Sequence, residues 1–200
     1  MANKKKFDIV DIGPDGILEP EETVEEVNKE FEDSNIAQDP SEEDLKDIYE
    51  GRVINHIYRV QTYLVSLINL INNRALRHDR SKLDSPEKDA LIHYNEDKLH
   101  QYPYGSSEWR AEDKAQRADD KVNEAYLHHV KSNFHHPESY LEGVNDMDLI
   151  DLLELVADLK ADSQEYAGLM TMEEYVTAYC EMHRLPHVLL YIFMNTLERF

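Results

Sequence analysis

The chain has 200 residues, of which 41% are hydrophobic and 32% are charged, and its formal net charge at pH 7 is -21. This length suits one domain with a sizeable core. The acidic excess argues against binding along a nucleic-acid backbone, because phosphate contacts need Lys and Arg. It fits a protein that holds cations, or one whose acidic surface meets a basic partner.

More than half of the acidic excess lies in residues 1–50. Residues 1–43 combine dense Asp and Glu with Gly and Pro and with few large apolar residues, so we expect an acidic N-terminal arm that is partly disordered and mostly flexible. A short helix from Pro20 to Phe31 is the alternative for part of this arm. We expect residues 44–200 to form a separate helical domain.

The sequence indicates a reducing, aqueous compartment. Cys180 is the only cysteine, so no intramolecular disulfide can form. The start, "MANKKKFDIV", has no apolar run long enough for a signal peptide. The longest apolar run, residues 188–194, is too short to span a membrane. We therefore expect a cytoplasmic protein of a bacterium or a phage-infected cell, with no membrane partner.

From Asp44 onward, apolar residues recur at steps of three to five, which is typical of helices and predicts an all-α fold. Residues 107–132 read as one long helix, and a cap at Asn145 or Asp146 opens the next. Thr171 and Glu174 form a capping box. The last helix starts at Pro186, and its apolar residues should be buried, namely Val188, Leu189, Ile192, Phe193 and Leu197.

Metal sites in proteins are built from imidazoles and carboxylates that several elements bring together. Four places in this chain offer such groups. They are His56, the His78–Asp79 pair, the segment "HHVKSNFHHPE" (residues 128–138), and Glu154 with Asp158.

The segment at residues 128–138 is the least expected by chance, because it holds four histidines within nine residues. His129, Asn133 and His136 share one face of a helix for as long as the helix lasts. Pro137 limits its continuation. The alternative is a solvated histidine-rich surface turn.

His56 can join His78 at one ion only if the chain reverses between them. The two are 22 residues apart, which is about 33 Å along a straight helix. The reversal would fall around Leu67, where asparagines are tolerable turn residues but no Gly or Pro is present. Lys82 follows Asp79 by three residues and could neutralise a phosphate, although an exposed loop lysine is an equal alternative.

The order His56, then His78–Asp79, then further histidines and Asp158 resembles the HD-domain metal phosphohydrolase superfamily. Its members are all-α, bind one or two divalent metals through a His…HisAsp…Asp set, and in many cases cleave phosphate esters of nucleotides. The run "HDRSK" is similar to the "HD-x-G-K" version of cyclic-dinucleotide phosphodiesterases, with Ser81 in place of Gly.

Residues 52–165 also resemble a small, uncharacterised family from phages and bacteria. Its motifs are "H-x-x-x-V", "HD-x-SK" followed by an acidic residue and "Y", "HH-x-x-x-N-x-HH", and "E-x-x-x-D". Here they correspond to His56–Val60, "HDRSK", Glu87 with Tyr94, "HHVKSNFHH", and Glu154–Asp158.

The resemblance implies an HD-like helical bundle with His56, His78, Asp79 and Asp158 as ligands of Mn, Mg, Fe or Zn. It implies that His129 and His136 bind a second metal or face the substrate. The small phosphorylated substrate would be a nucleotide or a similar ester. Asp79 would bridge two ions or orient the attacking hydroxide. Lys82 would stabilise phosphoryl charge, and His129 or His136 would protonate the leaving oxygen.

A second hypothesis is a phage-type binding or inhibitory protein that uses an acidic surface on an HD-like scaffold. The acidic arm would then occupy a basic protein partner. A third is a structural helical bundle whose histidines are incidental. Deleting residues 1–43 should leave catalysis intact under the first hypothesis and abolish function under the second.

Overall fold

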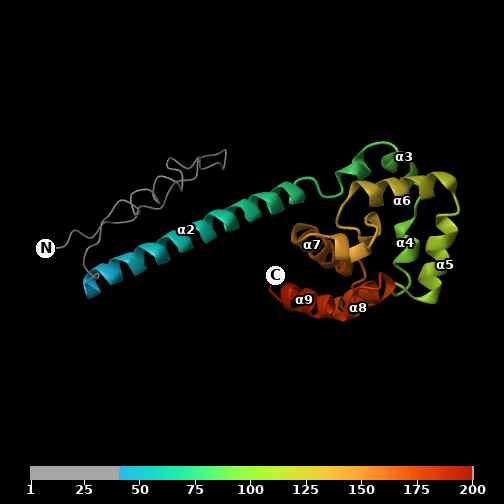
Figure 1. Cartoon of the computed structure of the whole chain (residues 1–200). Helices are drawn as coiled ribbons and strands as arrows, with labels where there is room; N and C mark the ends of the chain where they lie inside the picture. The colour runs from blue at the N-terminus through green and yellow to red at the C-terminus, as the bar shows by residue number, and fades with distance from the viewer. Residues whose placement is uncertain (1–40, 200) are drawn as a thin grey trace. The chain divides into compact units, whose positions relative to one another are not determined.

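The computed structural model describes residues 41–199, so most of the acidic arm, with the helix considered for Pro20–Phe31, lies outside the described residues. Residues 41–199 form eight α-helices and no strand, which confirms the all-α prediction (Figure 1). The helices are α2 (Glu42–Ala75), α3 (Glu87–Leu91), α4 (Glu96–Leu99), α5 (Ser107–Gln116), α6 (Asp120–Ser132), α7 (Leu149–Glu165), α8 (Met172–Met182) and α9 (His187–Leu197).

Three short 3-10 helices complete the secondary structure, η1 (Arg80–Leu83), η2 (Pro137–Ser139) and η3 (Gly143–Asp146). Among these described helices, none is both long enough and apolar enough to cross a membrane.

The chain divides into two compact units between Asn69 and Leu70, inside α2. The first unit contributes only the N-terminal part of α2 to the described residues, and the second contains everything from Leu70 onward. Ser41 and Asp44 cap the start of α2 through reciprocal hydrogen bonds. The expected domain boundary between residues 43 and 44 falls in the first turn of this helix and stays a prediction.

Helix α2 is continuous over 34 residues, and none of its residues is buried. The chain reversal considered around Leu67 is therefore absent from α2. No Gly or Pro interrupts residues 52–75, and each residue continues the helical hydrogen bonding.

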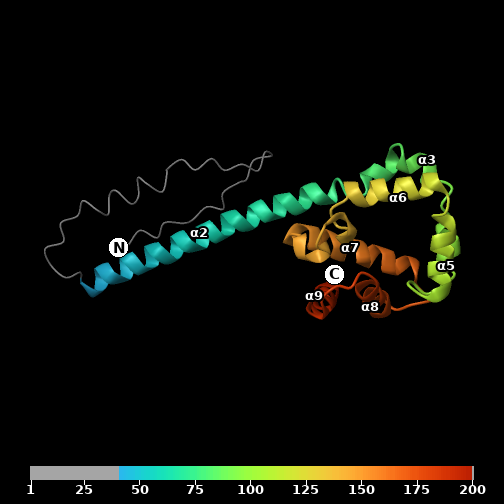
Figure 2. The ribbon, with the colours of Figure 1, turned by 45° about the vertical axis from the view of Figure 1, so that its right-hand side comes forward.

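The core of the second unit is built around α7, which packs against α8 and α9 (Figure 2). Leu155 and Leu159 of α7 are fully buried, and they belong to the same apolar cluster as Val176 and Phe193. Trp109 of α5 joins this cluster and donates a hydrogen bond from its indole nitrogen to the Tyr166 hydroxyl at 2.9 Å. Helix α3 lies against α6 and completes the part of the unit that carries the site.

The single helix predicted for residues 107–132 is wrong, because the chain forms α5 and α6 instead. Asp119 between them has an extended backbone, and its side chain accepts hydrogen bonds from the backbone N–H groups of Lys121 and Val122. This is an N-cap, which starts a new helix and ends any continuation from α5.

The other helix starts agree more closely with the sequence. The Thr171–Glu174 capping box is present, and α9 follows Pro186 directly. Helix α7 begins at Leu149, later than predicted, because Asp148 and Asp151 form its capping box. In α9 only Phe193 and Leu197 are buried, whereas Val188 and Ile192 are exposed, since α9 covers the core with one face.

Candidate metal centre

His78 and Asp79 lie in the turn between the end of α2 and η1. Asp79 has a left-handed backbone conformation with φ of 52°, which is uncommon for residues other than Gly and is tolerated best by Asn and Asp. Lys82 in η1 reaches back, and its Nζ lies 2.8 Å from Asp79 Oδ2. The expected proximity of Lys82 and Asp79 is therefore found, although a 3-10 helix produces it.

The histidine-rich segment leaves the helix earlier than its spacing indicated. Helix α6 ends at Ser132, and Asn133 has an extended backbone. The Asn133 side-chain nitrogen donates to the backbone oxygen of His129 at 2.8 Å, which fixes the exit of the chain. His135 and His136 follow in the loop and turn back toward His129, so that the His129 and His136 Nε2 atoms lie 2.9 Å apart.

The third contribution comes from α7, which presents Glu154 and Asp158 on one face, four residues apart. Asp158 Oδ1 lies 3.2 Å from His78 Nε2, and Asp158 Oδ2 lies 3.6 Å from His135 Nε2. One carboxylate thus links two histidines from two different loops.

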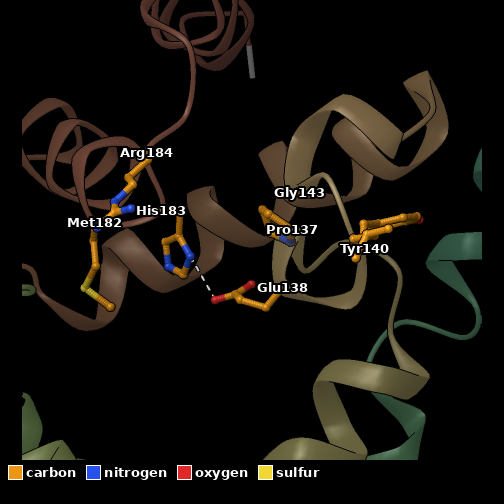
Figure 3. A pocket seen from close by; sticks show the side chains of 8 residues that line it. Pro137, Glu138, Tyr140, Gly143, Met182, His183 and Arg184 are labelled. Carbon is orange, nitrogen blue, oxygen red and sulfur yellow. Dashed lines mark ion pairs between the residues drawn. The ribbon is translucent and has the colours of Figure 1, made fainter.

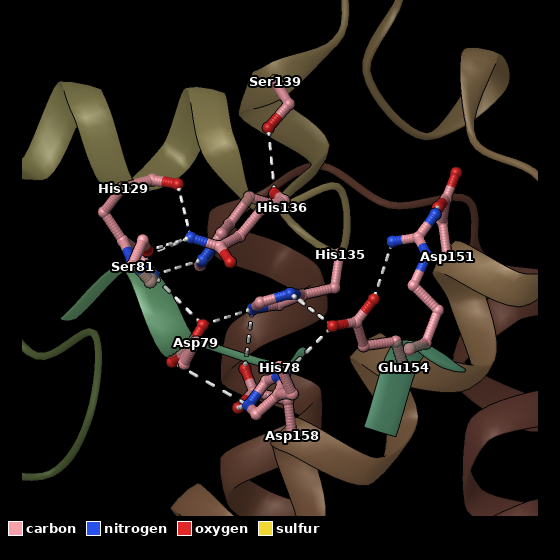
Figure 4. A network of polar contacts seen from close by, with 12 residues as sticks. His78, Asp79, Ser81, His129, His135, His136, Ser139, Asp151, Glu154 and Asp158 are labelled. Atoms are coloured by element: carbon pink, nitrogen blue, oxygen red, sulfur yellow. Dashed lines mark hydrogen bonds and ion pairs between the residues drawn. The ribbon is translucent and has the colours of Figure 1, made fainter. Parts of the chain in front are cut away.

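These residues form two overlapping groups whose ligand atoms all lie within 4.8 Å of one another (Figure 4). The first group is Asp79, His129, His135 and His136, and the second is His78, Asp79, His135 and Asp158. Asp79 and His135 belong to both. We call these six residues together the His/Asp centre.

The donor spacing in the centre fits a metal ion. Ligand atoms bound to one ion at roughly 2.0–2.2 Å lie about 3.3–3.6 Å apart in a tetrahedral site. Asp79 Oδ1 lies 3.6 Å from the Nε2 atoms of both His129 and His135, and Asp79 Oδ2 lies 3.8 Å from His78 Nε2. These separations are longer than hydrogen bonds and close to those of atoms that share a cation.

Asp79 Oδ1 and both ring nitrogens of His135 are buried and have no hydrogen-bond partner within residues 41–199. Buried polar atoms are nearly always satisfied, and a group left without a partner costs about 1–3 kcal/mol. A cation between Asp79 and His135 would satisfy both residues. The unsatisfied atoms therefore fit a metal and give no support to the histidine-rich surface turn.

Glu154 orients two of the histidines from behind. Its Oε1 lies 3.1 Å from His78 Nδ1 and 3.3 Å from His135 Nδ1. Its Oε2 accepts a hydrogen bond at 2.8 Å from Arg74, which also pairs with Asp151. A carboxylate beside Nδ1 directs Nε2 toward the shared centre, which is the usual outer arrangement of a metal-binding histidine. The contact with His135 Nδ1 lacks hydrogen-bond geometry.

Glu87 has the corresponding position behind His129. It is fully buried, and its two oxygens contact His129 Nδ1 at 2.9 Å and His128 Nδ1 at 2.7 Å. The Ser81 hydroxyl donates to the same carboxylate at 3.0 Å and accepts from Asn133 at 2.9 Å. The residues that the sequence places in "HDRSK", at Glu87 and in "HHVKSNFHH" are therefore connected by hydrogen bonds.

The electrostatics of the centre separate the histidines into two kinds. Hydrogen bonding to Asp158 and Glu154 raises the pKa of His78 to about 10, so a proton occupies this position in the metal-free protein. Burial lowers the pKa of His129, and burial with the neighbouring His135 and His129 lowers the pKa of His136 to about 3. His129 and His136 are thus neutral near pH 7, as metal ligands must be.

Two of the acids in this network stay ionised. Burial would raise the pKa of Asp79, but the Lys82 ammonium together with His129 and His78 outweighs burial and lowers that pKa. Burial would also raise the pKa of Glu154, and contact with His135 and His78 holds it well below the usual range. Negative charge therefore persists where a cation would bind.

The structure brings together most of the residues predicted for the site, namely His78, Asp79, Lys82, His129, His136 and Asp158. It does not bring His56 to them: His56 is exposed on the uninterrupted helix α2 and belongs to neither group. His135 is the ligand candidate that sequence reasoning missed. Helical spacing favoured His129 and His136, whereas His135 faces the centre only because α6 ends before it.

A separate pocket of about 510 Å³ lies between η2 and the end of α8 (Figure 3). It contains Glu138 and His183, whose Oε1 and Nδ1 atoms are 2.8 Å apart. None of the residues that line it belongs to the His/Asp centre.

A family model described as "Family of unknown function (DUF5662)" matches residues 46–198. The chain belongs to this family. The match includes all six residues of the His/Asp centre, and it contains the whole of residues 52–165. Searches of curated proteins and of solved structures each returned no significant match.

Proposed function

We propose that this protein is a metal-dependent phosphohydrolase whose active site is the His/Asp centre, with a nucleotide or a similar small phosphate ester as substrate. The observation that carries the proposal is the buried, unsatisfied Asp79 oxygen that faces the Nε2 atoms of His129 and His135. The resemblance of "HDRSK" and Asp158 to the HD-domain superfamily supports the choice of reaction.

The donor set favours a transition metal. One group offers three imidazoles and one carboxylate, and the other offers two of each. Imidazole suits Zn, Fe and similar ions, whereas Mg²⁺ prefers oxygen ligands and retains water. We therefore favour Mn, Fe or Zn over Mg. A bound divalent ion would act as a Lewis acid toward phosphoryl oxygens and lower the pKa of coordinated water.

Lys82 is the residue best placed to bind the phosphate. Its side chain is 45% exposed, and its neighbours raise its pKa above the ordinary value, so it keeps its charge at neutral pH. In the metal-free protein it pairs with Asp79. Once Asp79 neutralises a cation instead, the Lys82 ammonium becomes available to a phosphoryl oxygen.

The lowered pKa values of His129 and His136 fit ligands better than proton donors, because a neutral buried imidazole rarely carries a proton to deliver. We therefore assign both residues to metal binding and keep Asp79 and Lys82 as the groups that act on the reaction. The acidic surface of the chain makes a long polyanion a poor substrate.

The test is hydrolysis of nucleoside phosphates and of p-nitrophenyl phosphate by protein loaded with Mn²⁺, Fe²⁺ or Zn²⁺. Lys82→Ala should keep its metal and lose turnover, Asp79→Ala should lose both, and His187→Gln, outside the centre, should match the wild type. Metal-loaded wild type that is no faster than Asp79→Ala on every ester would overturn the hydrolase and leave the metal site standing.

The acidic-surface binding protein is tested by deleting residues 1–43. Under the hydrolase proposal, hydrolysis by the shortened chain equals that of the full chain. If the shortened chain keeps its hydrolysis but no longer binds a basic protein that the full chain binds, the arm has a basic protein partner.

A further inference from the structure

Helix α2 carries many large apolar side chains that are exposed, and none of its residues is buried. Residues 60–73 contain no charged side chain. The large apolar residues of α2 that are exposed are Leu45, Tyr49, Ile54, Ile57, Tyr58, Val60, Tyr63, Leu64, Leu67, Ile68, Leu70 and Ile71. Helices draw most of their stability from packing an apolar face, and exposed apolar patches of this extent mark interaction surfaces.

The spacing of these residues identifies the kind of partner. Val53, Ile57, Val60, Leu64, Leu67 and Ile71 follow one another at alternating steps of four and three residues. We call these six the α2 seam. Steps of four and three keep side chains on one stripe of a helix and are the repeat of a coiled coil. The seam is about 27 Å long, and its partner should be another helix.

The charges of α2 point to a second copy in the opposite direction. Residues 42–50 hold five acids and one lysine, whereas residues 51–75 hold three arginines and no acid. Parallel pairing would place the two acidic ends side by side, which like-charge repulsion disfavours. Antiparallel pairing places the two acidic ends at opposite ends of the interface, so this repulsion is avoided.

The seam is also self-complementary in that direction. An antiparallel register centred between Val60 and Leu64 places each of them opposite the other residue in the partner. The same register places Val53 opposite Ile71 and Ile57 opposite Leu67. Every layer then joins two branched aliphatic side chains, as a two-fold symmetric interface requires.

We propose that α2 pairs with α2 of a second copy of this chain in antiparallel orientation through the α2 seam. This proposal is independent of the metal centre, because none of the six residues of the α2 seam belongs to that centre.

The first test is the mass of the full chain by sedimentation velocity over a range of micromolar concentrations. The wild type should sediment at twice the 23.4 kDa chain mass. Leu64→Glu introduces a charge into the seam and should yield monomer, whereas Asn69→Glu, on the opposite side of the same helix, should remain a dimer. Circular dichroism of each variant verifies that the fold persists.

A wild type that stays monomeric would overturn the proposal and indicate that the seam is covered within one chain, by residues 1–40 or by the second unit. A dimer that Leu64→Glu leaves intact would overturn it too.

Orientation is tested with two single variants, Val53→Cys and Ile71→Cys. In an antiparallel pair, oxidation links the two variants when they are mixed, and neither forms a covalent dimer alone. Covalent dimers from Val53→Cys alone would contradict the antiparallel orientation. Cys180 is buried and serves as the background in the unmodified chain.

Discussion

At the scale of single residues, the centre depends on carboxylates that never touch the reacting groups. Glu154 contacts two imidazoles and Arg74, and Glu87 contacts two further imidazoles and Ser81. Each carboxylate fixes which ring nitrogen of a histidine faces the centre. Outer contacts of this kind typically change metal affinity by about 10–100-fold when they are removed.

Replacing Glu154 by Gln tests this dependence. The amide keeps the shape and loses the negative charge beside Nδ1 of His78 and His135, so Zn²⁺ affinity should fall by about 10–100-fold. Competition titration against a chromogenic chelator measures the loss. Glu165→Gln, at the exposed end of the same helix, is the control, and equal affinities for the two variants would remove Glu154 from the account.

The protonation of His78 gives a prediction about pH. Folding raises the pKa of His78 from 6.5 to about 10 in the metal-free protein. A raised pKa stabilises the folded state fully below the unfolded pKa, and this contribution is lost as pH rises through about 10. The urea midpoint of chelator-treated protein should therefore decrease between about pH 7 and about pH 10.

His78→Gln removes the titrating group and should flatten that decrease. The comparison needs metal-free protein in both cases, because a metal displaces the His78 proton. Equal slopes for the variant and the wild type would show that His78 does not hold the proton.

At the scale of elements, Asp119 decides where α6 starts. It accepts hydrogen bonds from two backbone N–H groups, and this cap separates α6 from α5, which the sequence predicted to be one helix. Asp119→Ala should lower the free energy of unfolding by about 1 kcal/mol. Asp120→Ala, one residue later and without this cap, is the control in urea denaturation, and a cost no larger than that of the control would contradict the assignment.

The same element shows what the sequence can and cannot predict. The sequence pattern predicted that residues 107–132 are mostly helical. It did not reveal the cap at Asp119, because a cap interrupts the helix without changing the residue pattern on either side. The end of α6 at Ser132 was likewise not visible in the sequence pattern, and it changes which histidines reach the site. His129 and His136 were predicted from helical spacing, and they meet through a loop that also delivers His135.

His56 shows the opposite limit. Its order along the chain matched the HD-domain pattern, yet the turn that would bring it to His78 had no signal in the sequence, and α2 runs on without one. The other residues that the motif order named, at the turn near His78 and on α7, lie together in the structure. When a long helix separates two motif residues, their order along the chain does not show whether they lie close together.

At the scale of the whole molecule, the net charge of -21 and the carboxylates of the His/Asp centre both favour the binding of cations. Carboxylates that remain ionised in a buried position require compensation, and Lys82 and the protonated His78 supply it in the metal-free protein. A divalent cation bound between the carboxylates would neutralise their charge more strongly than Lys82 and His78 do. The fold from Leu70 onward thus brings together, from two loops and α7, a group of side chains that could hold a cation.

The most direct test of this central claim is the metal content of the full chain purified without chelators, measured beside Asp79→Ala and His187→Gln. The account predicts about one or two equivalents of a transition metal in the wild type and in His187→Gln, and loss of that metal in Asp79→Ala. Folded wild type that carries no metal and takes up no Mn²⁺, Fe²⁺ or Zn²⁺ would contradict it.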